Sequence, residues 1–221
     1  MSDPSRSRAP ARIVRKRAAP DRRPHIRKTE PGPQFRHLLR EATADDHLET
    51  ERLFECFLTA PDDRMGWFLA AQRAAMGALA AAVPNSGEPN ASADGLLTSA
   101  YVLSDLIARL DRDLARQNRR AVPLPLSNEG KFDQTLHPMA VDYVVLGSRL
   151  GNEMIRRTVL ADRFTGPLPD YFQAAPQADL WRYLCTSLDR LDPHSDEAQD
   201  VIQDAKSAFR IVSDAARLQK V

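Results

Sequence analysis

Three side chains that can bind a metal or an anion lie close together near the start of the predicted folded region. Arg40, Thr43 and His47 are spaced at i, i+3 and i+7, so they share one face of the helix expected there. A neutral imidazole is a common metal ligand, and a guanidinium can form paired hydrogen bonds to a carboxylate. A lone helical histidine is also often a structural residue, so the spacing alone leaves both interpretations open.

Two glycines lie four residues apart in a strongly apolar segment that is predicted to be helical. Gly147 and Gly151 fall within residues 143–152, and each glycine costs about 1 kcal/mol relative to alanine inside a helix. One explanation is close packing of this helix against another helix. The other is that the missing side chains let the backbone approach a flat ligand. The sequence leaves both explanations open.

The segment around His47 resembles the N-terminal signature of the haem oxygenase family, Leu-(Arg/Lys)-x-x-Thr-x-x-x-His-x-x-x-Glu. The matching residues are Leu39, Arg40, Thr43, His47 and Glu51. The resemblance implies that His47 is the axial ligand of haem iron, with the opposite face of the iron left open for oxygen. It also implies that Arg40 lies near a haem propionate.

The segment around the two glycines looks like the distal helix of bacterial haem oxygenases. The matching residues are Tyr143, Val144, Gly147, Ser148, Leu150 and Gly151. Two positions depart from the family pattern, because Leu146 replaces a glutamate and Asn152 replaces a small residue. A partial third match comprises Trp181, Arg182, Tyr183, Leu184, Ala205, Ala208 and Phe209, so that the resemblance covers about residues 36–217.

The family's distal residues carry over to this sequence position by position. By resemblance, Gly147, Ser148, Gly151 and Asn152 form the catalytic side of the haem pocket, and Tyr143 joins Gly147 and Gly151 in contacting haem. Asn152 is expected to point away from the haem-facing stripe, because successive helical residues differ by about 100°.

The activity implied by the resemblance is the opening of haem to biliverdin, carbon monoxide and ferrous iron. A b-type haem is then both cofactor and substrate, and dioxygen is the second substrate. The sequence has no Gly-rich nucleotide motif, so a ferredoxin or flavoprotein reductase is expected to supply electrons, and a phytochrome is a candidate acceptor of biliverdin. The alternative is a non-catalytic haem-oxygenase-like domain that senses haem or binds another protein.

Apolar residues recur at helical spacing along most of the chain, and no alternating run typical of a strand competes with them. The sequence therefore predicts an all-α, single-domain helical bundle. The resemblance to haem oxygenases further implies that haem lies between the first helix and a kinked helix over residues 143–155. Helices are expected over about 35–60, 64–83, 93–119, 138–161, 178–191 and 196–219, with a loop over 121–135 and a Pro/Gly-rich connection over 166–169.

Residues 1–33 differ in composition from the rest of the chain. They hold six prolines and ten basic against three acidic residues, a net charge of +7, whereas residues 34–221 carry a net charge of −6. We expect a disordered basic tail before a folded domain over 34–221, and no specific nucleic-acid partner. The sequence contains no membrane span or secretory signal, and Cys56 and Cys185 form no Cys-x-x-Cys motif, which favours a cytoplasmic location.

Other candidate ligands are weaker. His137 precedes Pro138 and is expected to act at a helix start. His37 lies ten residues before His47, almost three helical turns away, too far to bind the same iron. No Glu-x-x-His pair that would indicate a di-iron carboxylate site occurs in the sequence.

Overall fold

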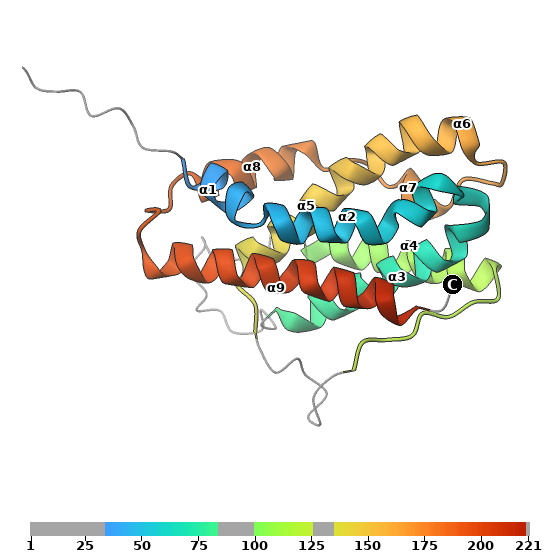
Figure 1. Ribbon diagram of the computed structural model, residues 1–221, viewed down its shortest axis with the longest axis horizontal. Coiled ribbons are helices and arrows are strands. Elements are labelled where there is room, and N and C mark those ends of the chain that lie inside the picture. Colours follow the sequence, from blue (N-terminus) through green and yellow to red (C-terminus); the bar gives the residue numbers. More distant parts are fainter. Residues whose placement is uncertain (1–33, 84–99, 126–134, 220–221) are drawn as a thin grey trace, which may run out of the picture. The chain divides into compact units, whose positions relative to one another are not determined.

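The computed structural model describes residues 34–83, 100–125 and 135–219, and these residues form helices and connecting segments without any strand. The prediction of an all-α fold is confirmed (Figure 1). No helix among the described residues is long and apolar enough to cross a membrane. The predicted tail over 1–33, the predicted helical residues 93–99 and most of the loop over 121–135 lie outside the described residues.

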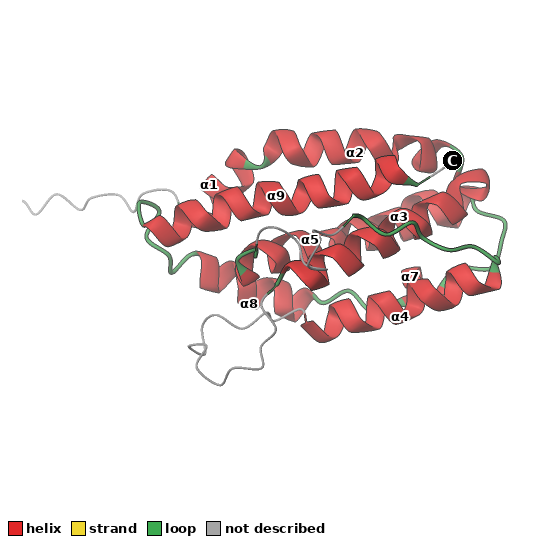
Figure 2. Ribbon diagram, turned by 90° about the horizontal axis from the view of Figure 1, so that it is seen from below, coloured by secondary structure: helices red, strands yellow, loops and turns green. Residues whose placement is uncertain are grey.

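The described residues form the following helices along the chain. Their bounds are α1 (Phe35–Ala42), α2 (Ala44–Thr59), α3 (Pro61–Ala82), α4 (Ala100–Arg116), α5 (Pro138–Ile155), the π-helix η2 (Arg156–Leu160), α6 (Ala161–Arg163), α7 (Asp170–Gln173), α8 (Ala178–Leu188) and α9 (Asp196–Leu218). α3 is buried on nearly all sides, as expected for a helix that is apolar all round. It packs against α4 and α9, and α9 also contacts α2 and α5 (Figure 2).

The first predicted helix is wrong in one respect, because it is two helices separated at Thr43. The backbone of Thr43 leaves the helical region at φ −103° and ψ 6°, and its hydroxyl donates to the carbonyl oxygen of Leu39 at 2.8 Å. Such bonding by a threonine hydroxyl to the preceding turn bends helices. Arg40 and His47 therefore lie on different helices, and the single face predicted for them is interrupted.

The helix that contains the two glycines begins where the sequence predicts. Pro138 occupies its first turn, and the Nδ1 of His137 accepts a hydrogen bond from the backbone N–H of Met139 at 3.2 Å, which confirms the helix-start role expected for His137. α5 stays α-helical through both glycines, and the departure from α-helical geometry comes at the π-helical turn η2. Single π-helical turns are rare and often lie beside functional sites.

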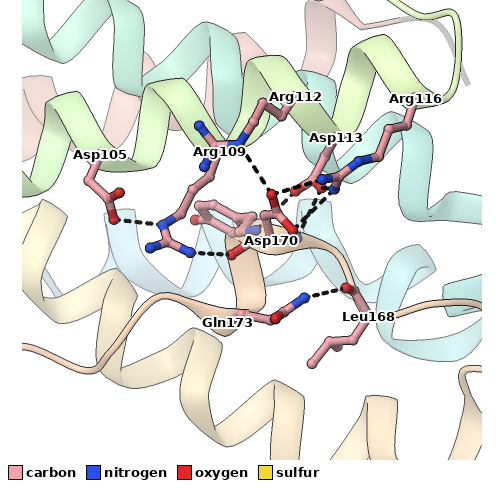
Figure 3. A network of polar contacts seen from close by, with 9 residues as sticks. Asp105, Arg109, Arg112, Asp113, Arg116, Leu168, Asp170 and Gln173 are labelled. Carbon is pink, nitrogen blue, oxygen red and sulfur yellow. Dashed lines mark hydrogen bonds and ion pairs between the residues drawn. The ribbon is translucent and has the colours of Figure 1, made fainter.

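The short helix α7 was not predicted, because it lies between two proline-containing connections. It is held from outside by α4: the carboxylate of Asp113 accepts the backbone N–H groups of Asp170 and Tyr171, each at 2.9 Å. Arg112 and Arg116 of α4 converge on the Asp170 carboxylate (Figure 3). Their hydrogen bonds hold the pKa of Asp170 below its usual value. A carboxylate on another helix thus caps α7.

Replacement of Asp113 with alanine is expected to destabilise the fold by about 2 to 4 kcal/mol, because a buried and a partly buried N–H group lose a charged acceptor. Asp113 is 3% exposed. Asp105→Ala is the matched control, since it removes a carboxylate from the same helix whose partner Arg109 lies one turn away at the surface; a change within about 0.5 kcal/mol is expected. Urea unfolding monitored by circular dichroism measures the stability of both variants. Equal unfolding midpoints for Asp113→Ala and Asp105→Ala would contradict the capping role.

Candidate functional site

A cavity of about 680 Å³ lies between α2 and α5. Its floor comes from α3 and α9, and Trp181 of α8 contributes to its lining. On α2 the lining extends from His47 to Leu58, roughly 16 Å at 1.5 Å per residue. The side chains are mostly apolar and include Phe54, Leu58, Phe68, Met76, Val144, Trp181, Phe209 and Val212. The space is therefore an elongated, largely apolar slot between two helices.

His47 lies on the α2 wall of this slot. Its side chain is 57% exposed, and its Nδ1 lies 3.6 Å from a carboxylate oxygen of Glu51 one turn later. The imidazole packs edge-on against the ring of Phe209, with 5.6 Å between ring centroids. The described residues give Nε2 no hydrogen-bond partner, so this nitrogen is open to a ligand. A carboxylate beside the other nitrogen is the usual means of orienting a metal-binding imidazole.

Tyr143 lines the same slot from the opposite helix. Its ring contacts those of Trp181 and Phe209, at centroid distances of 5.8 and 6.4 Å. Burial raises the pKa of the Tyr143 hydroxyl, while a hydrogen bond with Thr43 and the positive charge of Arg40 act in the opposite direction. Tyr143 therefore connects the cavity with the break between α1 and α2.

The two glycines face different surroundings. A Cβ atom added to Gly147 would meet the indole of Trp181 at 3.7 Å, which is ordinary contact, so an alanine would also fit against α8 at this position. A Cβ added to Gly151 would meet nothing within 4 Å, although Gly151 lines the cavity. Close helix packing therefore does not explain Gly151, whereas a ligand that occupies the cavity would.

The other two predicted distal residues also line the cavity, and each donates one hydrogen bond within the protein. The hydroxyl of Ser148 donates to the backbone carbonyl of Val145 at 2.7 Å. The side-chain amide of Asn152 is 5% exposed and donates to the hydroxyl of Tyr171 at 2.7 Å. Asn152 thus reaches toward the buried floor of the cavity rather than out across its open centre.

Arg40 is the one predicted site residue that the lining does not include. It lies exposed near the end of α1, and its charge reaches the hydroxyl of Tyr143. Arg52 of α2 lines the cavity instead, together with Glu51 and Glu55. Arg52 was missed because it follows the histidine motif without matching any position of it. Arg52 is therefore better placed than Arg40 to bind an anionic group of a ligand in the cavity.

Sequence reasoning also missed Gln72 and Tyr171. Gln72 lines the cavity from α3 and is 6% exposed, and it accepts a hydrogen bond from the hydroxyl of Tyr171 at 3.0 Å. A polar residue in the middle of an apolar helical stripe was the available signal for Gln72. No local signal marks Tyr171, whose partners lie 19 and 99 residues away in the sequence.

A second, larger groove of about 1070 Å³ lies between α3 and α4. It is lined by Arg73, Arg119, Arg120 and several small residues, and it contains none of the side chains that the sequence singled out. The described residues include no group of three or more His, Cys, Asp or Glu side chains suited to holding a metal ion. The slot between α2 and α5 is therefore the candidate site.

Comparisons with known proteins give no relatives for this chain. No protein-family model matches it, and neither the curated proteins nor the solved structures contain a match.

Proposed function

We propose that the slot between α2 and α5 binds haem and that the protein opens the ring to biliverdin, carbon monoxide and ferrous iron. The observation that carries the proposal is the placement of His47 and Gly151 on the two helices that flank one cavity. Gly151 has nothing within 4 Å of the position that a Cβ would occupy. An imidazole on one wall and a bare backbone on the other suit a flat, metal-containing ligand.

The few metal-binding side chains in the cavity favour a ligand that itself supplies most of the bonds to its metal. In the described part of the chain the cavity offers one histidine, and no cluster of further metal-binding side chains accompanies it. A porphyrin supplies four nitrogens, so a single axial imidazole is sufficient to anchor its iron. The apolar lining suits the porphyrin face, since such pockets are mostly apolar with a few placed polar groups.

In this proposal the residues of α2 and α5 have different roles in binding haem. His47 would bind through Nε2, and the Glu51 carboxylate, 3.6 Å from Nδ1, lies on the side from which it can orient the ring. Gly151 leaves the opposite side of the slot open. Tyr143, Trp181 and Phe209 line one region of the slot with aromatic rings that are in contact with one another. Arg52 at the α2 side is the candidate partner for a haem carboxylate.

Bound haem would supply both the redox-active iron and the ring carbon that is oxidised. The protein's own residues bind and orient it, and they leave room for dioxygen on the side away from His47. Electrons would come from a ferredoxin or a flavoprotein reductase, and a phytochrome is a candidate acceptor of the product.

The test is a spectral titration of the purified protein with hemin, followed by ascorbate under air. The expected result is a saturable Soret band at one hemin per chain, which decays as biliverdin absorbance grows. A saturable Soret band that persists with a reductase and dioxygen would instead support the non-catalytic haem-sensing alternative. Failure to bind hemin saturably would refute both.

A further inference from the structure

The largely apolar slot contains a small polar region built from three helices. Gln72 of α3 and Asn152 of α5 both line the cavity, yet each is more than nine-tenths buried. The hydroxyl of Tyr171 in α7 lies between them: it accepts from Nδ2 of Asn152 at 2.7 Å and donates to Oε1 of Gln72 at 3.0 Å. Tyr171 itself is fully buried and does not line the cavity.

Because the tyrosine has one proton, one amide must donate to it and the other must accept from it. Burial raises the pKa of the Tyr171 hydroxyl, so it stays protonated and has one proton to donate. Because it donates to Gln72 and accepts from Asn152, the opposite atoms are left over: Oδ1 of Asn152 as an acceptor and Nε2 of Gln72 as a donor. Neither atom has a hydrogen-bond partner among the described residues. Neither is fully enclosed by protein atoms. Both atoms are therefore open to the cavity.

Tyr171 is held rigidly enough to impose this arrangement. Its backbone N–H donates to the carboxylate of Asp113 at 2.9 Å. The guanidinium of Arg149 lies 5.3 Å from the centre of its ring and donates to the carbonyl of Ala174, just beyond α7, at 2.7 Å. The ion pairs that anchor Asp170 to α4 add to this support (Figure 3). Polar groups fixed in this way are pre-organised for a ligand.

We propose that Gln72 and Asn152 form a polar subsite of the cavity for one small hydrogen-bonding molecule, and that Tyr171 is the positioning residue that sets its polarity. In the unliganded protein this molecule is water. The further claim that the subsite acts on a small ligand of bound haem rests on the proposed function. The geometry supplies one donor and one acceptor in a site otherwise lined by carbon, which is the arrangement that holds an ordered water.

The first test needs no haem. Crystal structures of the unliganded wild type, Tyr171→Phe and Tyr101→Phe should be compared at a resolution that shows ordered water. Tyr101→Phe is the matched control, because it removes a hydroxyl that donates to the amide oxygen of Gln177 at 2.8 Å on the exposed face of α4. We expect a water bonded to both amides in the wild type and the control, and its loss in Tyr171→Phe. Absence of that water from the wild type, or its persistence in Tyr171→Phe, would overturn the subsite.

The second test uses azide as a probe of the hemin complex. We expect the azide dissociation constant to rise about fivefold in Tyr171→Phe, the effect of losing one positioned hydrogen bond, while Tyr101→Phe and hemin affinity stay within about twofold. Gln72→Met removes the donor directly and serves if Tyr171→Phe does not fold. Unchanged azide affinity in a hemin-bound variant would overturn the role toward bound haem and leave the proposed function standing. Failure of hemin to bind would refute the proposed function, and the water test would still decide the subsite.

Discussion

Replacement of His47 with alanine is expected to remove the axial imidazole from the hemin complex and to abolish biliverdin formation. The side chain belongs to the cavity wall, and its Nε2 has no competing partner in the described part of the chain. The imidazole is more than half exposed, so its loss leaves no buried void, and the melting temperature should change by less than about 2 °C.

Because the cavity would persist in this variant, added imidazole should enter it and restore part of the spectrum. The matched control is His194→Ala, which removes an exposed histidine from the connection before α9, outside the cavity lining. His194→Ala should bind and degrade hemin as the wild type does. A His47→Ala protein with an unchanged Soret band and unchanged turnover would show that another residue binds the iron.

The helical elements could largely be predicted from the sequence, because each rests on local signals. Pro138 marks the first turn of α5 where the sequence predicts it, whereas α3 begins at Pro61, three residues before its predicted start. The hydroxyl of Ser195 caps α9 by accepting a hydrogen bond from the N–H of Ala198. The break at Thr43 is different in kind. Threonine is tolerated inside helices, and its bond to Leu39 is one of several local options. Periodicity alone therefore could not locate the bend.

The site was predictable where a side chain acts through its own helix, and not where it depends on distant partners. The motifs around His47, Gly147 and Gly151, through their resemblance to those of haem oxygenases, pointed to residues that the fold brings to one cavity. The direction of Asn152 instead depends on Tyr171, and the position of Tyr171 depends on Asp113 in α4. These contacts join segments 19 and 58 residues apart, which no local pattern encodes.

Replacement of Gly151 with leucine is expected to separate stability from ligand binding. A Cβ at this position meets nothing within 4 Å, so a larger side chain can project into the cavity without displacing protein atoms. Leucine also favours the helix by about 0.8 to 1 kcal/mol relative to glycine. The unliganded variant should therefore be as stable as the wild type or more stable, whereas the cavity should no longer accept hemin, with affinity reduced at least about 100-fold.

Ser104→Leu is the control for Gly151→Leu, because it places the same side chain on an exposed position of α4, away from the cavity. Thermal unfolding of the unliganded proteins and hemin titration of each measure the two effects separately. Loss of binding together with an unchanged or raised melting temperature identifies Gly151 as a position kept bare for a ligand. A Gly151→Leu protein that binds and degrades hemin normally would remove α5 from the haem site, since a leucine there occupies the space on the side of the slot opposite His47.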